Sequence, residues 1–197
     1  EVDKEAGRFA AVLCDAMRFL SLFAGIGGFD LGLERSGWQC VGQVEIDEFC
    51  QRVLAKHWPN VPKWRDVRDV TSRSLDEAGI ARPTLISGGF PCQPFSYAGK
   101  RRGKEDDRHL WPQMLRAIRD IRPTWVVGEN VLGIVSWNGG MVFDEVQADL
   151  EAEGYEVQPY VLPACAVNAP HRRDRVWFVA YAGNKSGGGE EGCKNIR

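Results

Sequence analysis

The chain has 197 residues, of which 44% are hydrophobic and 26% are charged. These values are typical of a globular domain with a sizeable core, and they exclude a disordered or fibrous chain. The 25 Lys and Arg residues against 27 Asp and Glu residues give a net charge of −2. Any nucleic-acid partner must therefore be met by local basic patches, because no overall basic field exists.

Cysteine and histidine usage gives no sign of a metal site. The six cysteines include no C-x-x-C pair, and the three histidines are scattered along the chain, so we expect no metal. We find neither a signal-peptide pattern nor an apolar run long enough for a bilayer, so we expect no membrane association. Free thiols then indicate a reducing, cytoplasmic location.

From Arg18 onward, short apolar runs alternate with stretches of helical spacing. The expected strands are residues 18–23, 39–45, a short one within 63–70, 84–87, 125–129, 155–162 and 175–182. The expected helices are residues 29–36, 48–57 with Asp47 as its cap, a helix or turn at 76–79, 110–121 and 141–153. This alternation predicts an α/β doubly wound sheet with right-handed crossovers and ligands at the carboxyl ends of its strands.

The two ends of the chain differ from this pattern. Residues 1–16 show no convincing periodicity and precede Met17, so we interpret them as an extension or a tag. Residues 183–197 are rich in Gly, Lys, Glu and Ser, which predicts a disordered tail. Residues 17–182 are expected to form one catalytic domain.

A glycine-rich turn, Phe23-Ala24-Gly25-Ile26-Gly27-Gly28, follows the first expected strand. Glycines at such a point let the backbone approach a ligand closely. Glu45 ends the second strand and has the position of the acid that binds ribose hydroxyls in dinucleotide folds. Asp66 is a candidate acceptor for an adenine amine. A plain tight turn and solvated carboxylates are the alternative interpretations.

Cys92 lies in the sequence Gly88-Gly89-Phe90-Pro91-Cys92-Gln93-Pro94, directly after the fourth strand. Prolines on both sides restrict the backbone and hold the thiol in place. We therefore predict a nucleophile here. A buried structural cysteine is the alternative, and it suits Cys40, Cys50 and Cys165 better, since these lie in apolar strand-like or helix-like contexts.

Charged residues follow two further strand ends. Glu129, in Glu-Asn-Val, comes after the fifth strand and would face the same cleft as Cys92, where it could handle a proton on a pyrimidine nitrogen. Arg173 and Arg175 alternate along an extended segment, so they would point together into that cleft. The alternatives are a charge at the rim for Glu129 and a solvated basic turn for the two arginines. The basic run at residues 100–104 is a candidate for phosphate contacts, with a solvated charge run as the alternative.

Together these motifs resemble the cytosine-5 DNA methyltransferase family, in family order, over residues 18 to about 182. The resemblance implies a Rossmann-like, S-adenosylmethionine-dependent methyltransferase sheet, mostly parallel with an antiparallel last strand. It also implies that Cys92 adds to carbon-6 of cytosine, that Glu129 binds the ring nitrogen at position 3, and that Arg173 and Arg175 hold the base oxygen. The cofactor-binding positions that it implies are Phe23, Ala24, Gly25, Ile26, Gly27, Gly28, Glu45, Ile46, Asp66, Val67, Gly89, Pro91 and Leu110.

The implied substrate is a cytosine flipped out of double-stranded DNA. This suggests restriction-modification in a prokaryotic or phage-infected cell, at the nucleoid. Family members continue into a target-recognition region and a final motif, which are absent here, so a separate chain is a possible source of target recognition. Two alternatives remain open: a tRNA cytosine-5 methyltransferase on the same frame, and a truncated or split cofactor-binding fragment that does not act alone.

Overall fold

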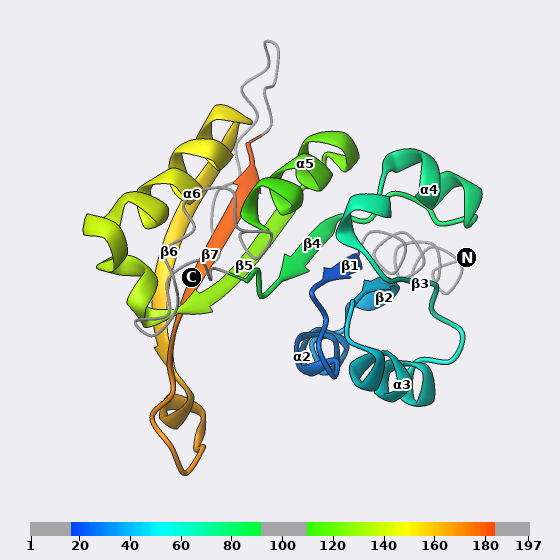
Figure 1. Cartoon of the computed structure of the whole chain (residues 1–197), viewed down its shortest axis with the longest axis horizontal. Coiled ribbons are helices and arrows are strands. Elements are labelled where there is room, and N and C mark those ends of the chain that lie inside the picture. Colours follow the sequence, from blue (N-terminus) through cyan, green and yellow to red (C-terminus); the bar gives the residue numbers. More distant parts are fainter. Residues whose placement is uncertain (1–16, 92–109, 184–197) are drawn as a thin grey trace, which may run out of the picture.

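A seven-stranded sheet forms the centre of the molecule (Figure 1). The structure is a computed structural model that describes residues 17–91 and 110–183. The predictions made for residues 1–16, for Cys92 and the basic run after it, and for the C-terminal tail beyond residue 183 concern segments outside these ranges.

The strands lie in the order β3-β2-β1-β4-β5-β7-β6. Neighbours pair in parallel, except that β7 is antiparallel to both β5 and β6. The strands are β1 (Arg18–Leu22), β2 (Gln39–Val44), β3 (Lys63–Trp64), β4 (Leu85–Gly88), β5 (Trp125–Val131), β6 (Tyr155–Pro163) and β7 (Asp174–Ala182). The predicted doubly wound sheet with an antiparallel last strand is confirmed. Its order reverses between β1 and β4, so a crevice opens where these two strands end.

Helices pack on both faces of the sheet (Figure 1). One face carries α2 (Gly28–Arg35) and α3 (Glu48–His57), and the other carries α4 (Ser72–Glu77), α5 (Trp111–Ile121) and α6 (Met141–Ala152). The alternation along β1 shows the two layers: Leu20 belongs to the large core with α5 and α6, whereas Phe19 packs in the smaller cluster with Leu33 of α2. Short 3-10 helices are η1 (Val67–Asp69), η2 (Leu132–Val135), η3 (Trp137–Gly140) and η4 (Ala164–Val167).

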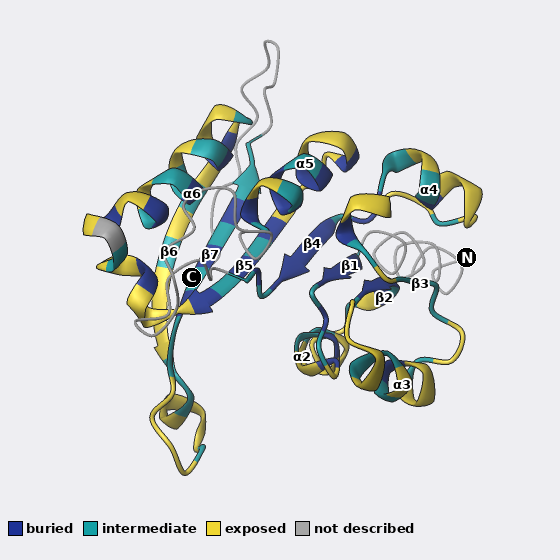
Figure 2. Ribbon diagram, viewed as in Figure 1, coloured by how far each residue is buried: buried dark blue, intermediate teal, exposed yellow. Residues whose placement is uncertain are grey.

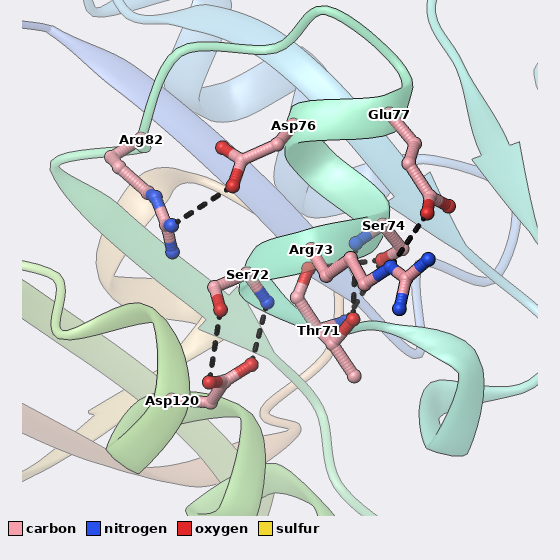
Figure 3. Close-up of polar contacts among 8 residues, drawn as sticks. All are labelled: Thr71, Ser72, Arg73, Ser74, Asp76, Glu77, Arg82 and Asp120. Carbon is pink, nitrogen blue, oxygen red and sulfur yellow. Dashed lines mark hydrogen bonds and ion pairs between the residues drawn. The ribbon is translucent and has the colours of Figure 1, made fainter.

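Local capping signals explain where α3 and α4 begin. The Asp47 side chain accepts a hydrogen bond from the Cys50 N–H, which confirms the predicted cap of α3 and lowers the pKa of Asp47. The prediction that residues 76–79 are part of a helix or turn is confirmed, because residues 76 and 77 end α4 and residues 78 and 79 form the turn after it, but the start of α4 at Ser72 was not predicted. Thr71 and Ser74 form a capping box at its start (Figure 3).

One part of the α2 and α3 face is not covered by any helix within the described ranges. Phe19, Leu85, Trp125 and Tyr181 are paired in register across four strands, so their side chains share this face. Phe19 and Leu85 are buried, whereas Trp125 is 38% exposed and Tyr160, on the same face of β6, is 49% exposed. Figure 2 shows the same contrast between the central strand β4, which is buried, and the edge strand β6, which is mostly exposed. We call Trp125, Tyr160 and Tyr181 the exposed strand face.

Residues 17–91 and 110–183 contain neither a membrane-crossing helix nor a cluster of metal-binding side chains. Among these residues, none of the helices combines the length and the apolar character needed to cross a membrane. The same residues contain no group of three or more His, Cys, Asp and Glu side chains arranged to bind a metal ion.

Candidate active site

A pocket of about 440 Å³ opens where the parallel strands β1 to β4 end. It is lined by Phe23, Val44, Glu45, Ile46, Arg65, Asp66, Val67, Arg68, Gly89, Pro91 and Leu110. The predicted cofactor positions thus come together here, apart from the glycine turn at 24–28, which does not line the pocket. Val44, Arg65 and Arg68 were missed by the sequence analysis. Their only signal was adjacency to the predicted acids Glu45 and Asp66.

Glu45 fixes the glycine turn to the end of β2. Its Oε2 accepts a hydrogen bond from the Gly25 N–H at 2.7 Å, and its Oε1 accepts one from the Asp47 N–H at 2.9 Å. A carboxylate oxygen can accept more than one hydrogen bond, so both oxygens keep capacity for hydroxyl donors. Gly27 has φ +88°, and a Cβ there would lie 2.4 Å from the Trp58 ring. The close approach of this turn to α3 therefore requires glycine.

Asp66 caps the short helix η1 at the edge of the pocket. Its Oδ1 accepts a hydrogen bond from the Arg68 N–H at 2.8 Å, and its Oδ2 lies 3.2 Å from Arg68 Nη1. Arg65 forms a similar exposed ion pair with Glu48 at 3.3 Å. Asp66 is thus already paired with a guanidinium, and its contact with an adenine amine stays a prediction.

Glu129 and Arg175 form an ion pair beside the pocket. Arg175 Nε lies 2.7 Å from Glu129 Oε1, and these side chains are only 20% and 23% exposed, respectively. Burial raises the pKa of Glu129 above its usual range, while the charges of Arg175 and Arg173 oppose that rise. A Cβ on Gly89 would lie 3.1 Å from Glu129 Oε2, so the acid directly adjoins the strand end that leads to Cys92.

Arg173 differs from its prediction. Its φ is +40°, and β7 begins only at Asp174. The expectation that Arg173 and Arg175 share a face of one extended segment is therefore wrong, because the backbone of Arg173 is left-handed, not extended, and it precedes the strand. Its charge nevertheless acts on Glu129, where it opposes the rise in pKa that burial causes. Both arginines therefore act on Glu129, although only Arg175 belongs to β7.

Asn130 anchors the backbone just before Cys92. Its side chain is buried, Nδ2 donates to the Phe90 carbonyl at 2.9 Å, and Oδ1 accepts from the Val131 N–H at 2.9 Å. The Phe90 ring is also buried and contacts Trp111, with ring centroids 5.0 Å apart. No role was predicted for Asn130 from the sequence, because its partner is the backbone carbonyl of a residue far away along the chain.

The predicted nucleophile Cys92 lies outside the described residues, but both sides of its segment are described. The Leu110 N–H donates to the Pro91 carbonyl at 3.4 Å, so the two described residues that flank Cys92 and the run after it meet at the pocket. Of the cysteines expected to be structural, only Cys40 is buried, and burial raises its pKa far above the usual value. Cys50 is partly exposed and Cys165 is exposed, so that expectation is wrong for Cys165.

The sheet order and the pocket at its switch point define a Rossmann-like methyltransferase fold. A protein described as a DNA modification methyltransferase encoded within a prophage of E. coli has a TM-score of 0.73 and 25% identity, over 84% of this chain and 47% of that one. The DNMT2 E260A/E261A/K263A mutant of Spodoptera frugiperda has a TM-score of 0.69 and 21% identity, over 90% of this chain and 53% of that one.

The sequence assigns the family. Residues 17–190 match the family described as C-5 cytosine-specific DNA methylase, and the chain belongs to this family. It is 36% identical over 163 residues to the type II methyltransferase M.HgiCII of Herpetosiphon aurantiacus. This alignment covers 82% of this chain but only 36% of M.HgiCII. The chain is 33% identical over 183 residues to M.AquIA of Picosynechococcus sp., over 86% of this chain and 73% of that protein. The chain thus spans only about a third of M.HgiCII.

Proposed function

We propose that this chain is the catalytic part of an enzyme that transfers a methyl group from S-adenosylmethionine to carbon-5 of cytosine in DNA. The observation that carries the proposal is the Glu129–Arg175 pair, which lies against Gly89 at the edge of the pocket. An acid with a raised pKa, a guanidinium and the strand end that leads to Cys92 then adjoin one small-molecule site, and this reaction needs such a combination.

The pocket fits an adenine nucleoside. Its volume of about 440 Å³ is within the usual range for a small-molecule site. Phe23, Val67 and Leu110 supply apolar surface, and the Glu45 and Asp66 carboxylates supply acceptors for hydroxyl and amine donors. We propose that these residues hold S-adenosylmethionine, which when bound supplies an electrophilic methyl group on a sulfonium.

The residues of this chain would prepare the base for attack. The Cys92 thiolate forms a bond to carbon-6 of cytosine, which gives carbon-5 the character of an enamine carbon. Glu129 would donate a hydrogen bond or proton to the ring nitrogen at position 3, and burial raises its pKa above the usual range. Arg175 orients Glu129 and, with Arg173, holds the base oxygen. Once carbon-5 carries the methyl group, loss of its proton re-forms the double bond between carbon-5 and carbon-6 and breaks the bond from carbon-6 to the Cys92 sulfur, which leaves as a thiolate.

Access of the base and choice of target require more than the described site. The reacting carbon lies inside the stack of a duplex, so the base must be flipped out. We propose that target recognition comes from the region by which relatives such as M.HgiCII exceed this chain, on a longer or a separate polypeptide. The bacterial relatives favour action at the nucleoid of a bacterial cell.

The direct test is methyl transfer from labelled S-adenosylmethionine to duplex DNA or to tRNA. The chain is assayed alone and with the C-terminal region of M.HgiCII supplied separately. We expect label in DNA, a loss of about 10²-fold or more in Glu129→Gln, and unchanged transfer in the matched control Cys165→Ser. Transfer to tRNA but not to DNA would support the RNA alternative. Absence of transfer under every condition would contradict the proposal.

A further inference from the structure

Two side chains of α5, one helical turn apart, reach the segment that includes η1. Arg116 Nη2 donates to the Val67 carbonyl at 2.7 Å and to the Val70 carbonyl at 3.0 Å. Asp120 accepts from the Ser72 N–H at 2.5 Å and from the Ser72 hydroxyl at 3.0 Å (Figure 3). Residues four apart on a helix lie on the same face, so one face of α5 holds this segment.

The segment held by α5 is a wall of the pocket. Asp66 and Val67 line the pocket, and Val70 is fully buried just behind them. Within the segment, the Val70 N–H donates to the Val67 carbonyl at 3.2 Å. A 3-10 helix of three residues has poor internal hydrogen-bond geometry, so its position depends on contacts from outside. A guanidinium is well suited to this, because its rigid, charged fork can donate to two carbonyls at once.

The same helix also carries another part of the pocket lining. Leu110 is the N-cap of α5 and lines the pocket, and its N–H donates to the carbonyl of Pro91, which lines it too. The body of α5 is fixed in the core through Met114 and Ile118, both fully buried. A single rigid helix therefore links the Leu110 part of the lining to the Asp66–Val67 wall.

We infer that Arg116, assisted by Asp120, is a positioning residue for the cofactor. It does not line the pocket, and it acts through the Val67 and Val70 carbonyls, which it holds at a fixed distance from Leu110. The inference rests on the proposed function, because the ligand is taken to be S-adenosylmethionine. Without Arg116 the wall would sample positions in which Asp66 and Val67 no longer face the ligand correctly.

Calorimetric titration of the full chain with S-adenosylmethionine tests the inference. We expect Arg116→Met to raise the Kd about tenfold, because binding must then order the wall. Arg119→Met is the matched control, since Arg119 is on the same helix but pairs with Glu153. It should change the Kd less than about twofold. Arg116→Lys should restore part of the affinity, because an ammonium keeps donors for the two carbonyls.

Amide hydrogen exchange of residues 67–72 in the cofactor-free chain gives a second readout. We expect faster exchange there in Arg116→Met and not in Arg119→Met. If Arg116→Met does not fold, Arg116→Lys and Asp120→Asn replace it, and each should weaken binding measurably. Wild-type affinity in the folded Arg116 and Asp120 variants would overturn the inference.

These experiments distinguish a failure of the positioning role of Arg116 from a failure of the proposed methyl transfer. Intact S-adenosylmethionine binding without methyl transfer would count against the proposed function only. If the wild-type chain does not bind S-adenosylmethionine, the proposed function fails, and exchange at residues 67–72 decides the role of Arg116. Unchanged exchange in Arg116→Met would then overturn it.

Discussion

Arg175→Met isolates the charge that faces Glu129. It removes a guanidinium whose Nε lies 2.7 Å from the carboxylate, and it keeps an apolar stem of similar length. Glu129 then loses its nearest counter-charge in a site where burial already raises its pKa. We therefore expect its pKa to rise further and the ionised form to destabilise the fold.

The size of the effect follows from the burial of the pair. Breaking a fully buried ion pair costs about 3–5 kcal/mol, whereas an exposed pair contributes about 0–1 kcal/mol. These side chains are 20% and 23% exposed, so the pair lies between these limits. We expect Arg175→Met to lower the free energy of unfolding by about 2 kcal/mol at pH 8.

The sign of the pH dependence distinguishes this from lost packing. In the variant the folded-state pKa of Glu129 lies above its unfolded value, so the folded protein binds the additional proton. The cost of the substitution should be small below the unfolded pKa and grow as the pH rises through the folded pKa. Urea unfolding followed by tryptophan fluorescence at pH 4.5 and pH 8 measures it. A Glu129→Gln background should remove most of the cost, and an equal cost at both pH values and in both backgrounds would refute the reasoning.

Further substitutions test the contacts around the pocket. Asn130→Leu leaves the Phe90 carbonyl without its donor, so chemical denaturation should show a loss of about 2 kcal/mol; a loss below about 0.5 kcal/mol would contradict the role of Asn130. Gly27→Ala places a methyl group 2.4 Å from the Trp58 ring at a positive φ, so the Tm should fall by several degrees, and an unchanged Tm would show that the turn can relax. Glu45→Gln removes an acceptor at the glycine turn, so calorimetry should show about tenfold weaker S-adenosylmethionine binding, and wild-type affinity would exclude the proposed role.

The fold could be predicted where local signals are strong. Asp47 caps α3, and a proline two residues after its last residue stops it, so its bounds were predicted correctly. The predicted end of the fifth strand at Glu129 was wrong, because β5 continues to Val131 through its pairing with Arg175 of β7. That pairing joins distant segments, and no local pattern indicates it. The start of α4 at Ser72 was missed because its capping box precedes a short, mostly polar helix.

Some residues of the candidate site could also be predicted from the sequence, and others could not. The carboxyl ends of parallel strands meet at one edge, so Glu45 and Asp66 could be expected to lie at one pocket. The roles of Asn130 and Arg116 could not be expected, because their partners are backbone carbonyls of segments 40 and 49 residues away. A backbone carbonyl has no sequence signature, so contacts of this kind become visible only when the chain is folded.

Cys92 is proposed to act as a nucleophile toward carbon-6 of cytosine. A duplex with 5-fluorocytosine traps the addition product, because fluorine on carbon-5 cannot leave as a proton does. The chain is incubated with this duplex and S-adenosylmethionine, alone and with the C-terminal region of M.HgiCII, and the peptide with the adduct is identified by mass spectrometry. We predict a covalent adduct at Cys92 that is lost in Cys92→Ser and kept in Cys165→Ser. The absence of any adduct with DNA or with the corresponding RNA, under both conditions, would contradict the claim.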